Sequence, residues 1–380
     1  MDTRQQKHLL EELLRLKQTG KFFLDDQPTT NPCTDYTDSS RFEQEYEGIF
    51  RRLPGIVAHA SELPEPNHFM RRRWNGLPLL LTRDDSGQAR LFLNVCRHRG
   101  TRLVDSEAGC RKRFSCPYHA WTWNNRGEFI GGPHFEAGFP GLDKSTLGLK
   151  VVPCEERHGF IWGLPENPRT DLGTFLAELE EELPWTGTYA LRVHATTQQL
   201  RRCNWKLLPE GGLEAYHFRV AHRNTIARMF NDNLSSYEAL GPHLRSILPR
   251  ASLTELAEQK PTDWNLREHA NVLYTVFPTN MLLVQMDHVI WINLEPLAHD
   301  ETIVRMTTLK PVDSAEPDGY WDKNHALTVE TLNEDFDLAE SMQSGMDSGA
   351  NEALNFGRFE GALFRFNETV REHLNSAPPD

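Results

Sequence analysis

The sequence reads CRHRG at residues 96–100 and CPYHAW at residues 116–121, and these two stretches decide the fold of the first half of the chain. Each stretch places one Cys and one His in a tight turn, and 17 residues lie between the His of the first and the Cys of the second. Two such clips can close one site with four ligands. Gly100 and Pro117 suit tight loops that aim backbone N–H groups at a bound group. The two stretches therefore predict a metal centre held by two loops.

The order of the ligands indicates which metal the centre holds. A Rieske-type [2Fe–2S] cluster takes two thiolates on one iron and two imidazoles on the other, so each clip would give one ligand to each iron. The alternative is structural zinc, because two Cys and two His also describe a zinc finger. A zinc finger pairs Cys with Cys and His with His, whereas each clip here mixes them. We therefore expect a [2Fe–2S] cluster whose ligands are Cys96, His98, Cys116 and His119. Cys110, which lies between the two clips, is expected to be an ordinary loop thiol.

The composition is that of an acidic globular protein. The chain has 380 residues, 38% of them hydrophobic and 25% charged, which is too long for one ordinary core and favours two domains. The net charge of −13 argues against nucleic acid or an anionic membrane as a partner. The six cysteines are too few for a disulfide framework, and the charged N-terminus does not resemble a signal peptide. We therefore expect a cytoplasmic protein that does not enter a membrane.

The hydrophobic pattern changes twice along the chain, and it predicts an α+β fold. Residues 1–40 begin with an amphipathic helix and form an N-terminal helical segment. Short apolar runs broken by Gly and Pro predict an all-β domain at 41–165, which would hold the cluster. Residues 166–380 would form the second domain, in which 272–310 alternate as an antiparallel meander and 322–375 form two helices.

A second metal centre is expected in the second domain, within residues 204–222. This segment contains Glu214, His217 and His222. Two His and one carboxylate bind Fe(II) on one face and leave positions open for O₂ and substrate. Glu214 and His217 would share a helix face, whereas His217 and His222 are five residues apart, about 140° around a helix, and can reach one metal only if the helix bends or ends between them. The alternative is two ordinary histidines among the sixteen of the chain.

The third iron ligand is expected from a helix that includes residues 332–343. On a helical wheel, Asp335 falls inside the apolar arc, Glu334 lies just outside it, and Asp337 lies on the polar side. A carboxylate on a buried face needs a metal or a charged partner, so Asp335 is the predicted ligand. The alternative is a carboxylate near the start of a helix that faces solvent. The arc itself comprises Leu332, Phe336, Leu338, Ala339 and Met342.

Together the two centres resemble those of the alpha subunit of Rieske non-haem iron oxygenases, the ring-hydroxylating dioxygenases with their monooxygenase, demethylase and quaternary-amine oxygenase relatives. The motifs are C-x-H-x₁₇-C-x₂-H and E-x₂-H-x₄-H, the latter preceded by Asn-Trp-Lys at 204–206, and the resemblance covers roughly residues 40–365. It implies a Rieske domain followed by a helix-grip catalytic domain, an antiparallel sheet packed by helices. It also implies O₂ activation at one mononuclear Fe(II) per subunit, with electrons from NAD(P)H. No G-x-G-x-x-G fingerprint is present, so a separate flavin or iron–sulfur reductase is expected.

The resemblance further implies a homotrimer, or a larger oligomer built on such a ring, in which each cluster serves the iron of its neighbour. Glu214 would then join the catalytic residues His217, His222 and Asp335, and it would hydrogen-bond to the partner subunit's His119. Many ring-hydroxylating members have Asp at this position, and members with Glu include oxygenases of quaternary ammonium compounds such as choline and carnitine. The substrate therefore stays open between an aromatic or carboxylate-bearing compound and, as the alternative, a quaternary ammonium compound or an N- or O-methyl group to be removed. A Rieske electron carrier without catalysis is the alternative of another class, and it would leave the second half of the chain without a role.

Three further features bear on the substrate. Arginines around the second motif indicate either a pocket for a carboxylate-bearing substrate or ordinary surface ion pairs; they are Arg219, Arg223, Arg228, Arg245 and Arg250. Residues 225–260, with Gly241, Pro242 and Pro249, are expected to form a lid. Several aromatic residues would line a pocket or a cage for a cation, or simply belong to the core; they are Trp205, Tyr216, Phe218, Tyr274, Phe277 and Trp291.

Overall fold

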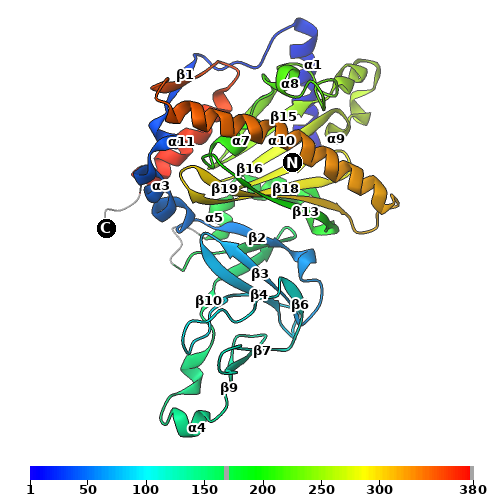
Figure 1. The fold of residues 1–380 in the computed structure, drawn as a ribbon. Coiled ribbons are helices and arrows are strands. Elements are labelled where there is room, and N and C mark those ends of the chain that lie inside the picture. The colour runs from blue at the N-terminus through cyan, green and yellow to red at the C-terminus, as the bar shows by residue number, and fades with distance from the viewer. Residues whose placement is uncertain (167–170, 377–380) are drawn as a thin grey trace. The chain divides into compact units, whose positions relative to one another are not determined.

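The computed structural model describes residues 1–166 and 171–376, which divide into two compact units. The larger unit combines Met1–Arg52 with Thr170–Asp380, and the smaller unit is Leu53–Arg169. The expected fold class, α+β with an all-β domain before the mixed one, is confirmed (Figure 1). Within the described ranges, no helix combines the length and the apolar character needed to cross a bilayer.

The smaller unit is built from short antiparallel strands, as their Gly- and Pro-rich spacing predicts. Its sheets have the strand orders β10-β5-β4-β3-β6, β11-β12-β2 and β7-β8-β9. A short helix, α4 (Phe135–Gly138), follows β9. The strands are β2 (Gly55–His59), β3 (His68–Trp74), β4 (Leu77–Arg83), β5 (Ala89–Leu93), β6 (Ala108–Cys110), β7 (Arg113–Ser115), β8 (Thr122–Asn124), β9 (Phe129–Gly131), β10 (Val151–Val152), β11 (Cys154–Arg157) and β12 (Phe160–Gly163).

The larger unit is centred on one antiparallel sheet of seven strands in the order β13-β19-β18-β17-β16-β15-β14. The meander expected at 272–310 is present as its four consecutive strands β16 to β19. The prediction that residues 225–260 form a lid is wrong for residues 236–249, which form the hairpin β14–β15 of this sheet. Burial explains the difference, because every residue of β15 is buried, and Gly241, with φ of 60°, makes the turn. The strands are β13 (Leu191–Arg201), β14 (Ser236–Leu240), β15 (His243–Pro249), β16 (Ala270–Val276), β17 (Asn280–Val284), β18 (Val289–Ala298) and β19 (Glu301–Pro311).

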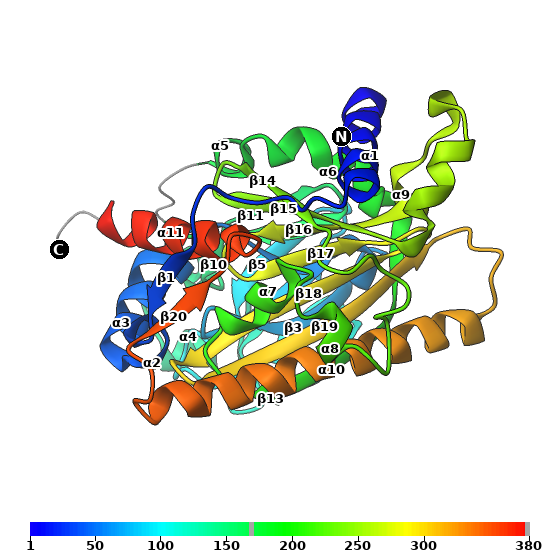
Figure 2. The same cartoon turned by 90° about the horizontal axis from the view of Figure 1, so that it is seen from above.

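Helices pack around this sheet, and the longest, α10, runs along β13 and β19 and touches α7 (Figure 2). The two helices expected in the tail are confirmed as α10 and α11. Between them, β20 (Ala353–Phe356) pairs with β1 (Thr29–Pro32) near the start of the chain. The helices are α1 (Thr3–Thr19), α2 (Thr34–Thr37), α3 (Ser39–Glu45), the π-helix η1 (Tyr46–Phe50), α5 (Leu172–Leu176), α6 (Leu179–Thr186), α7 (Leu207–Gly212), α8 (Phe218–Ala221), α9 (Leu266–His269), α10 (Asp318–Asp347) and α11 (Gly361–Asn375).

The Asn-Trp-Lys sequence at 204–206 ties the N-terminal residues to the larger unit. Glu45, at the end of α3, accepts a hydrogen bond of 2.8 Å from the indole of Trp205 and one of 2.7 Å from the ammonium of Lys206. Asn204 donates a hydrogen bond of 3.0 Å to the backbone carbonyl of Tyr36. All of these groups are buried, so residues up to Arg52 pack with this unit, whereas the sequence pattern placed the start of the Rieske domain at residue 41.

Candidate metal centres of the two units

The two Cys/His clips of the smaller unit fold as the same turn. Cys96 accepts a backbone hydrogen bond of 3.0 Å from Gly100, and Cys116 accepts one of 2.9 Å from Ala120. The residue that closes each turn is left-handed, with φ of 77° at Gly100 and 53° at Ala120. Gly suits this conformation because it has no Cβ, and Ala120 adopts it at some cost in energy. Both clips therefore present their side chains in equivalent geometry.

An aromatic cluster of the smaller unit packs against the two clips. Cys96 and Cys116 are each 3% exposed and belong to this cluster, together with the buried rings of Trp121 and Trp123. The ring of His98 stacks on Trp121, with centroids 4.7 Å apart and an angle of 12°. The packing fixes the thiols and one imidazole before any cofactor binds. Such preorganisation lowers the entropy that a bound group must overcome.

The donor atoms of the clips fit a [2Fe–2S] cluster better than zinc. One tetrahedral zinc would bring its ligand atoms to within roughly 3–4 Å of each other. Across the described residues, however, no three ligand atoms of the clips lie within 4.8 Å of one another. The rings of His98 and His119 lie side by side, 4.7 Å between centroids, and the buried Nδ1 atom of His98 has no hydrogen-bond partner in the described part of the chain. A buried ring nitrogen without a protein partner is free to bind iron, as the imidazole ligands of a Rieske cluster do.

The second centre lies in the larger unit, where His217, His222 and Asp335 offer ligand atoms that are all within 4.8 Å of one another. The two Nε2 atoms are 3.2 Å apart. Oδ1 of Asp335 is 3.4 Å from Nε2 of His217 and 3.0 Å from Nε2 of His222. Ligands at neighbouring positions around one small cation, with bonds of about 2.1 Å, are separated by about 3 Å. Two imidazoles and one carboxylate on one face are the donor set of non-haem iron(II).

A break in the helix brings the two histidines together. The helix expected to carry Glu214 and His217 is instead two short helices: α7 ends at Gly212, and α8 holds only Phe218–Ala221. His217 directly precedes α8 and His222 directly follows it, so neither obeys the helical spacing that would point them apart. The expected bend is therefore present, and it takes the form of a helix that begins and ends between the two ligands.

The contact expected between Glu214 and His217 is present, but it does not come from a shared helix face. Glu214 lies in the turn before α8 and accepts hydrogen bonds from the backbone N–H groups of Tyr216 and His217, the latter at 3.2 Å. Its other carboxylate oxygen contacts Nδ1 of His217. The carboxylate therefore shapes the turn and orients the ring at the same time. Carboxylates often hold metal-binding histidines in this way.

Glu334 holds the other histidine, a role that the sequence pattern did not indicate. Its carboxylate lies 2.8 Å from Nδ1 of His222 and accepts a hydrogen bond of 2.5 Å from the hydroxyl of Thr225. The helical wheel placed Glu334 outside the apolar arc, and no sequence signal tied it to a histidine more than a hundred positions earlier. With a carboxylate on Nδ1 of each ring, both Nε2 lone pairs can point to one metal.

The charges around this centre favour a cation. Burial lowers the pKa of His217, but hydrogen bonds to Asp335 and Glu214 outweigh it and raise that pKa to about 10. The pKa of His222 is also raised, since Asp335 outweighs the effect of burial. For Asp335 burial alone would raise the pKa, yet the two histidines hold it below its usual value. Protons thus occupy the place of a metal, and metal binding would displace them.

Helix α10 presents Asp335 on its buried side, as predicted, although the apolar arc was drawn too wide. Phe336 and Ala339 are 2% and 1% exposed. Leu338 and Met342, which the wheel placed in the arc, are 47% and 45% exposed. The face that packs on the sheet is centred on Ala339, and polar side chains such as Gln343 complete it. The arc was wrong on one side because an apolar side chain was taken as a sign of burial.

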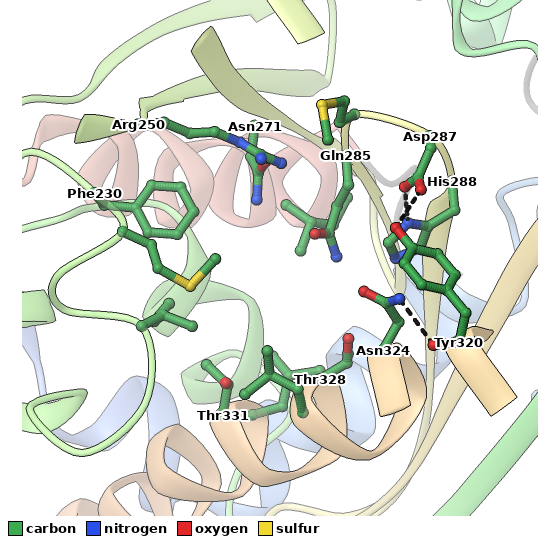
Figure 3. Close-up of a pocket in the computed structure, with 16 residues that line it drawn as sticks. Phe230, Arg250, Asn271, Gln285, Asp287, His288, Tyr320, Asn324, Thr328 and Thr331 are labelled. Carbon is green, nitrogen blue, oxygen red and sulfur yellow. Dashed lines mark hydrogen bonds and ion pairs between the residues drawn. The ribbon is translucent and has the colours of Figure 1, made fainter. Parts of the chain in front are cut away.

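Two adjoining cavities lie beside the second centre. The inner cavity reaches His222 and Asp335 and is otherwise mostly apolar, with Leu208, Leu273 and Met281 among its walls. The outer cavity, drawn in Figure 3, is more polar and includes Arg250, Asp287, His288 and Tyr320. The two share the lining residues Ile226, Phe230, Asn271, Leu283, Thr331 and Leu332.

The arginines and aromatic residues singled out in the sequence separate in the structure. Arg250 lines the outer cavity, whereas Arg245 is buried in ion pairs with Glu182 and Glu238. The side chain of Arg219 is 78% exposed, 3.7 Å from Asp232. Of the aromatic residues, Phe218 lines the inner cavity and Tyr216 is exposed. The other four are buried in the core: Trp205, Tyr274, Phe277 and Trp291.

Family models match both units of the chain. The model of the Rieske [2Fe–2S] domain matches residues 54–153, and that of the ring hydroxylating alpha subunit catalytic domain matches residues 185–376. The biphenyl 2,3-dioxygenase subunit alpha of Rhodococcus jostii is 32% identical over 57% of this chain and 48% of its own length. The glycine betaine monooxygenase oxygenase subunit of Pseudomonas aeruginosa is 34% identical over 50% of this chain and 44% of its own. The match thus spans about half the length of these curated relatives.

Solved structures agree on the fold over nearly the whole chain. The quaternary ammonium Rieske monooxygenase CntA, in complex with an inhibitor, superposes with a TM-score of 0.80 at 23% identity, covering 91% of this chain and 96% of that one. The naphthalene 1,2-dioxygenase of Rhodococcus sp. bound to indole gives a TM-score of 0.78 at 20% identity, covering 98% and 99%. At these identities the likeness shows the fold alone. With the family models, it shows that the chain belongs to the alpha subunits of the Rieske ring-hydroxylating oxygenases.

Proposed function

We propose that the protein is the terminal oxygenase of a multicomponent system and hydroxylates a small organic substrate at Fe(II) held by His217, His222 and Asp335. The observation that carries the proposal is the close approach of these three ligand atoms beside an apolar cavity. Iron bound to this donor set keeps open positions, where it can activate O₂ next to a substrate. A protein that only carries electrons would need neither the three converging ligand atoms nor the cavity beside them.

The residues of the chain have separate tasks in this reaction. Glu214 and Glu334 hold the Nδ1 atoms, so the two rings are fixed in direction with their Nε2 atoms toward the metal position. The apolar walls would exclude water and position the substrate beside His222 and Asp335, two of the residues that would hold the iron. Cys96, His98, Cys116 and His119 would hold the Rieske cluster, which supplies single electrons. Those electrons come from NAD(P)H through a separate flavin or iron–sulfur reductase.

We further propose that the protein works as a homotrimer, or a larger oligomer built on that ring, in the cytoplasm. In this arrangement Glu214 bonds to the partner subunit's His119, and electrons pass between subunits. Exposed apolar side chains support such interfaces on both units: Tyr216 and Val220, which flank His217, are 55% and 72% exposed, and Tyr118, which precedes His119, is 54% exposed. Large exposed apolar side chains that gather beside a functional residue are typical of an interface.

A second substrate class is kept open by one sequence feature and two relatives. The acidic residue before the first iron histidine is Glu214, and a relative of 34% identity is a glycine betaine monooxygenase. A related N,N-dimethyl phenylurea N-demethylase is 31% identical over half of this chain. Oxidation of a quaternary ammonium compound, or removal of an N- or O-methyl group, is therefore the alternative reaction.

The test is an assay of O₂ uptake. The iron-loaded protein, a surrogate reductase and NADH would be mixed with a panel of aromatic acids, neutral aromatics and quaternary amines. We expect substrate-dependent O₂ uptake and a hydroxylated or demethylated product, both lost in Asp335→Ala. A protein that passes electrons to an added acceptor but consumes no O₂ with any compound would be a carrier, which contradicts the proposal.

A further inference from the structure

We infer that the substrate is an organic anion, with its carboxylate bound by Arg250 in the outer cavity and its apolar body in the inner cavity. This inference rests on the proposed function and names the class of substrate. It is carried by an arginine that lines the cavity and forms no direct ion pair with any acidic side chain of the described residues.

The hydrogen-bond partner of Arg250 is neutral, and the ionised carboxylate of Asp287 stabilises the Arg250 charge only from a distance. Its Nε and Nη2 atoms donate hydrogen bonds of 3.1 Å and 2.7 Å to the amide oxygen of Asn271, which is neutral. No acidic side chain in the described ranges forms an ion pair with Arg250. Burial lowers the pKa of this guanidinium, which shows that it lies partly out of water. A half-buried guanidinium is stabilised by an anion, and its planar fork matches a carboxylate with two hydrogen bonds.

The nearest acidic residue of the cavity is engaged elsewhere. One carboxylate oxygen of Asp287 lies 2.6 Å from Nδ1 of His288, and the other accepts a hydrogen bond of 2.7 Å from the hydroxyl of Tyr320 (Figure 3). The hydrogen bond with His288 lowers the pKa of Asp287 to about 2, so it stays ionised. Each of its oxygens therefore has another hydrogen-bond partner, and Asp287 acts on Arg250 through its charge without a direct ion pair, which leaves the guanidinium able to bind a ligand carboxylate.

Arg245, in contrast to Arg250, is an arginine whose charge is compensated by ion pairs, as in a structural role. It is 4% exposed, and Glu182 and Glu238 bind its two terminal nitrogens. Arg245 lies in β15 and Arg250 directly follows that strand, yet of the two only Arg250 lines either of the cavities described above. Asn271, which lines both cavities, holds the Arg250 guanidinium from one side, and Nη1 has no hydrogen-bond partner among the described residues. The guanidinium is thus fixed in direction, and among the described residues it has no direct ion pair.

Thr331 marks the junction of the two cavities. Thr331 is 9% exposed and lines both cavities, and its hydroxyl has no hydrogen-bond partner among the described residues. It lies one helical turn before Asp335 on α10. A buried hydroxyl without a partner costs free energy, which a polar atom of a ligand would recover. The ligand that fits is therefore apolar at the iron end and anionic at the Arg250 end.

The test compares matched compounds by calorimetry on the iron-loaded protein without O₂. The probes are 3-phenylpropionate, its neutral amide, and a phenylalkyl trimethylammonium cation of similar length. We expect the carboxylate to bind wild type more tightly than the amide does. In Arg250→Gln the carboxylate should bind about 10- to 100-fold more weakly, as loss of a charge-assisted contact predicts, while the affinity of the amide changes less than about threefold.

Two variants control for charge and folding. Arg228→Gln removes the same charge from an exposed position outside both cavities, and it should leave carboxylate binding unchanged. Arg250→Lys keeps the charge and should retain part of the affinity. Equal binding of carboxylate and amide by wild type, or binding of the ammonium probe alone, would overturn the inference and leave the proposed oxygenase function standing. Failure of O₂ uptake with intact carboxylate selectivity would instead count against the proposed function.

Discussion

The carboxylate of Glu334 lies 2.8 Å from Nδ1 of His222, while the next residue on the same helix, Asp335, lies 3.0 Å from Nε2 of that ring. Two consecutive acidic residues of α10 thus contact the two nitrogens of one imidazole. This arrangement sets the tautomer, because a proton on Nδ1 is shared with Glu334 and leaves Nε2 free for a metal. The roles of the two carboxylates are different and can be separated by mutation.

Asp335→Ala should abolish binding of the mononuclear iron, whereas Glu334→Ala should weaken it about 10- to 100-fold, the usual effect of losing the partner of a metal-binding histidine. The control is Asp337→Ala, which removes a neighbouring carboxylate that pairs with Arg201 at 2.8 Å on the surface. Titration with a competing chelator measures the affinity. Loss of iron in Asp337→Ala with retention in Asp335→Ala would show that the assigned helix face is wrong.

Glu214→Gln should keep both metals and the oligomer but lose most of the steady-state turnover. The amide has nearly the same shape and can still accept one hydrogen bond, but it lacks the charge that orients His217 and would link it to the partner subunit's His119. Stopped-flow spectroscopy would follow reoxidation of the reduced cluster with substrate and O₂. Asp232→Asn, an exposed acid near α8, is the control. A wild-type reoxidation rate in Glu214→Gln would exclude this role.

His98→Cys should lower the reduction potential of the cluster, on the order of 100 mV or more, because a thiolate adds negative charge to the iron. Spectroelectrochemical titration measures the change. Cys110→Ser is the matched control, since Cys110 is an exposed thiol on β6 outside both clips, and its potential should equal that of wild type. A colourless protein that contains only zinc would exclude the cluster altogether.

Glu210→Gln should change how stability depends on pH. Burial raises the pKa of Glu210 to about 7, against 4.5 for an exposed Glu, so its contribution to stability is full below about pH 4.5 and is lost as the pH rises through 7. The difference amounts to at most about 3 kcal/mol. Gln keeps an acceptor for Tyr36, which donates a bond of 2.7 Å, and for Asn367.

Urea unfolding at acidic and mildly alkaline pH would test this expectation. The variant should gain stability relative to wild type as the pH rises from roughly 5 to 8, because it no longer buries an ionised carboxylate. Glu43→Gln, an exposed acid in α3, should show no such gain. A free-energy difference between Glu210→Gln and wild type that stays constant with pH would contradict the raised pKa.

Much of the site was predictable because its ligands come in short, local patterns. The Cys and His of each clip are separated by one or two residues, so their chemistry can be seen in the sequence. Asp335 could be chosen because a carboxylate among apolar positions of a helix is unusual. The assignment of these residues to the metals remains a prediction for the experiments above, as do the oligomer and the substrate.

What the sequence did not indicate depends on contacts between distant segments. Glu334 reaches His222 from a different helix, and nothing in the local pattern of either residue records the pairing. Glu45 pairs with Lys206 across 161 positions, which places helix α3 in the larger unit. The hairpin at 236–249 resembled a lid because Gly and Pro mark turns in both a loop and a hairpin.

The central claim is that one chain holds both a Rieske cluster and a mononuclear iron on His217, His222 and Asp335. Electron paramagnetic resonance of the reduced, anaerobic protein exposed to nitric oxide tests it most directly, because the two centres give separate signals. We predict that wild type shows both a Rieske signal and a ferrous–nitrosyl signal, and that His217→Ala loses only the second. A ferrous–nitrosyl signal of full intensity in His217→Ala, or no Rieske signal in wild type, would contradict the account.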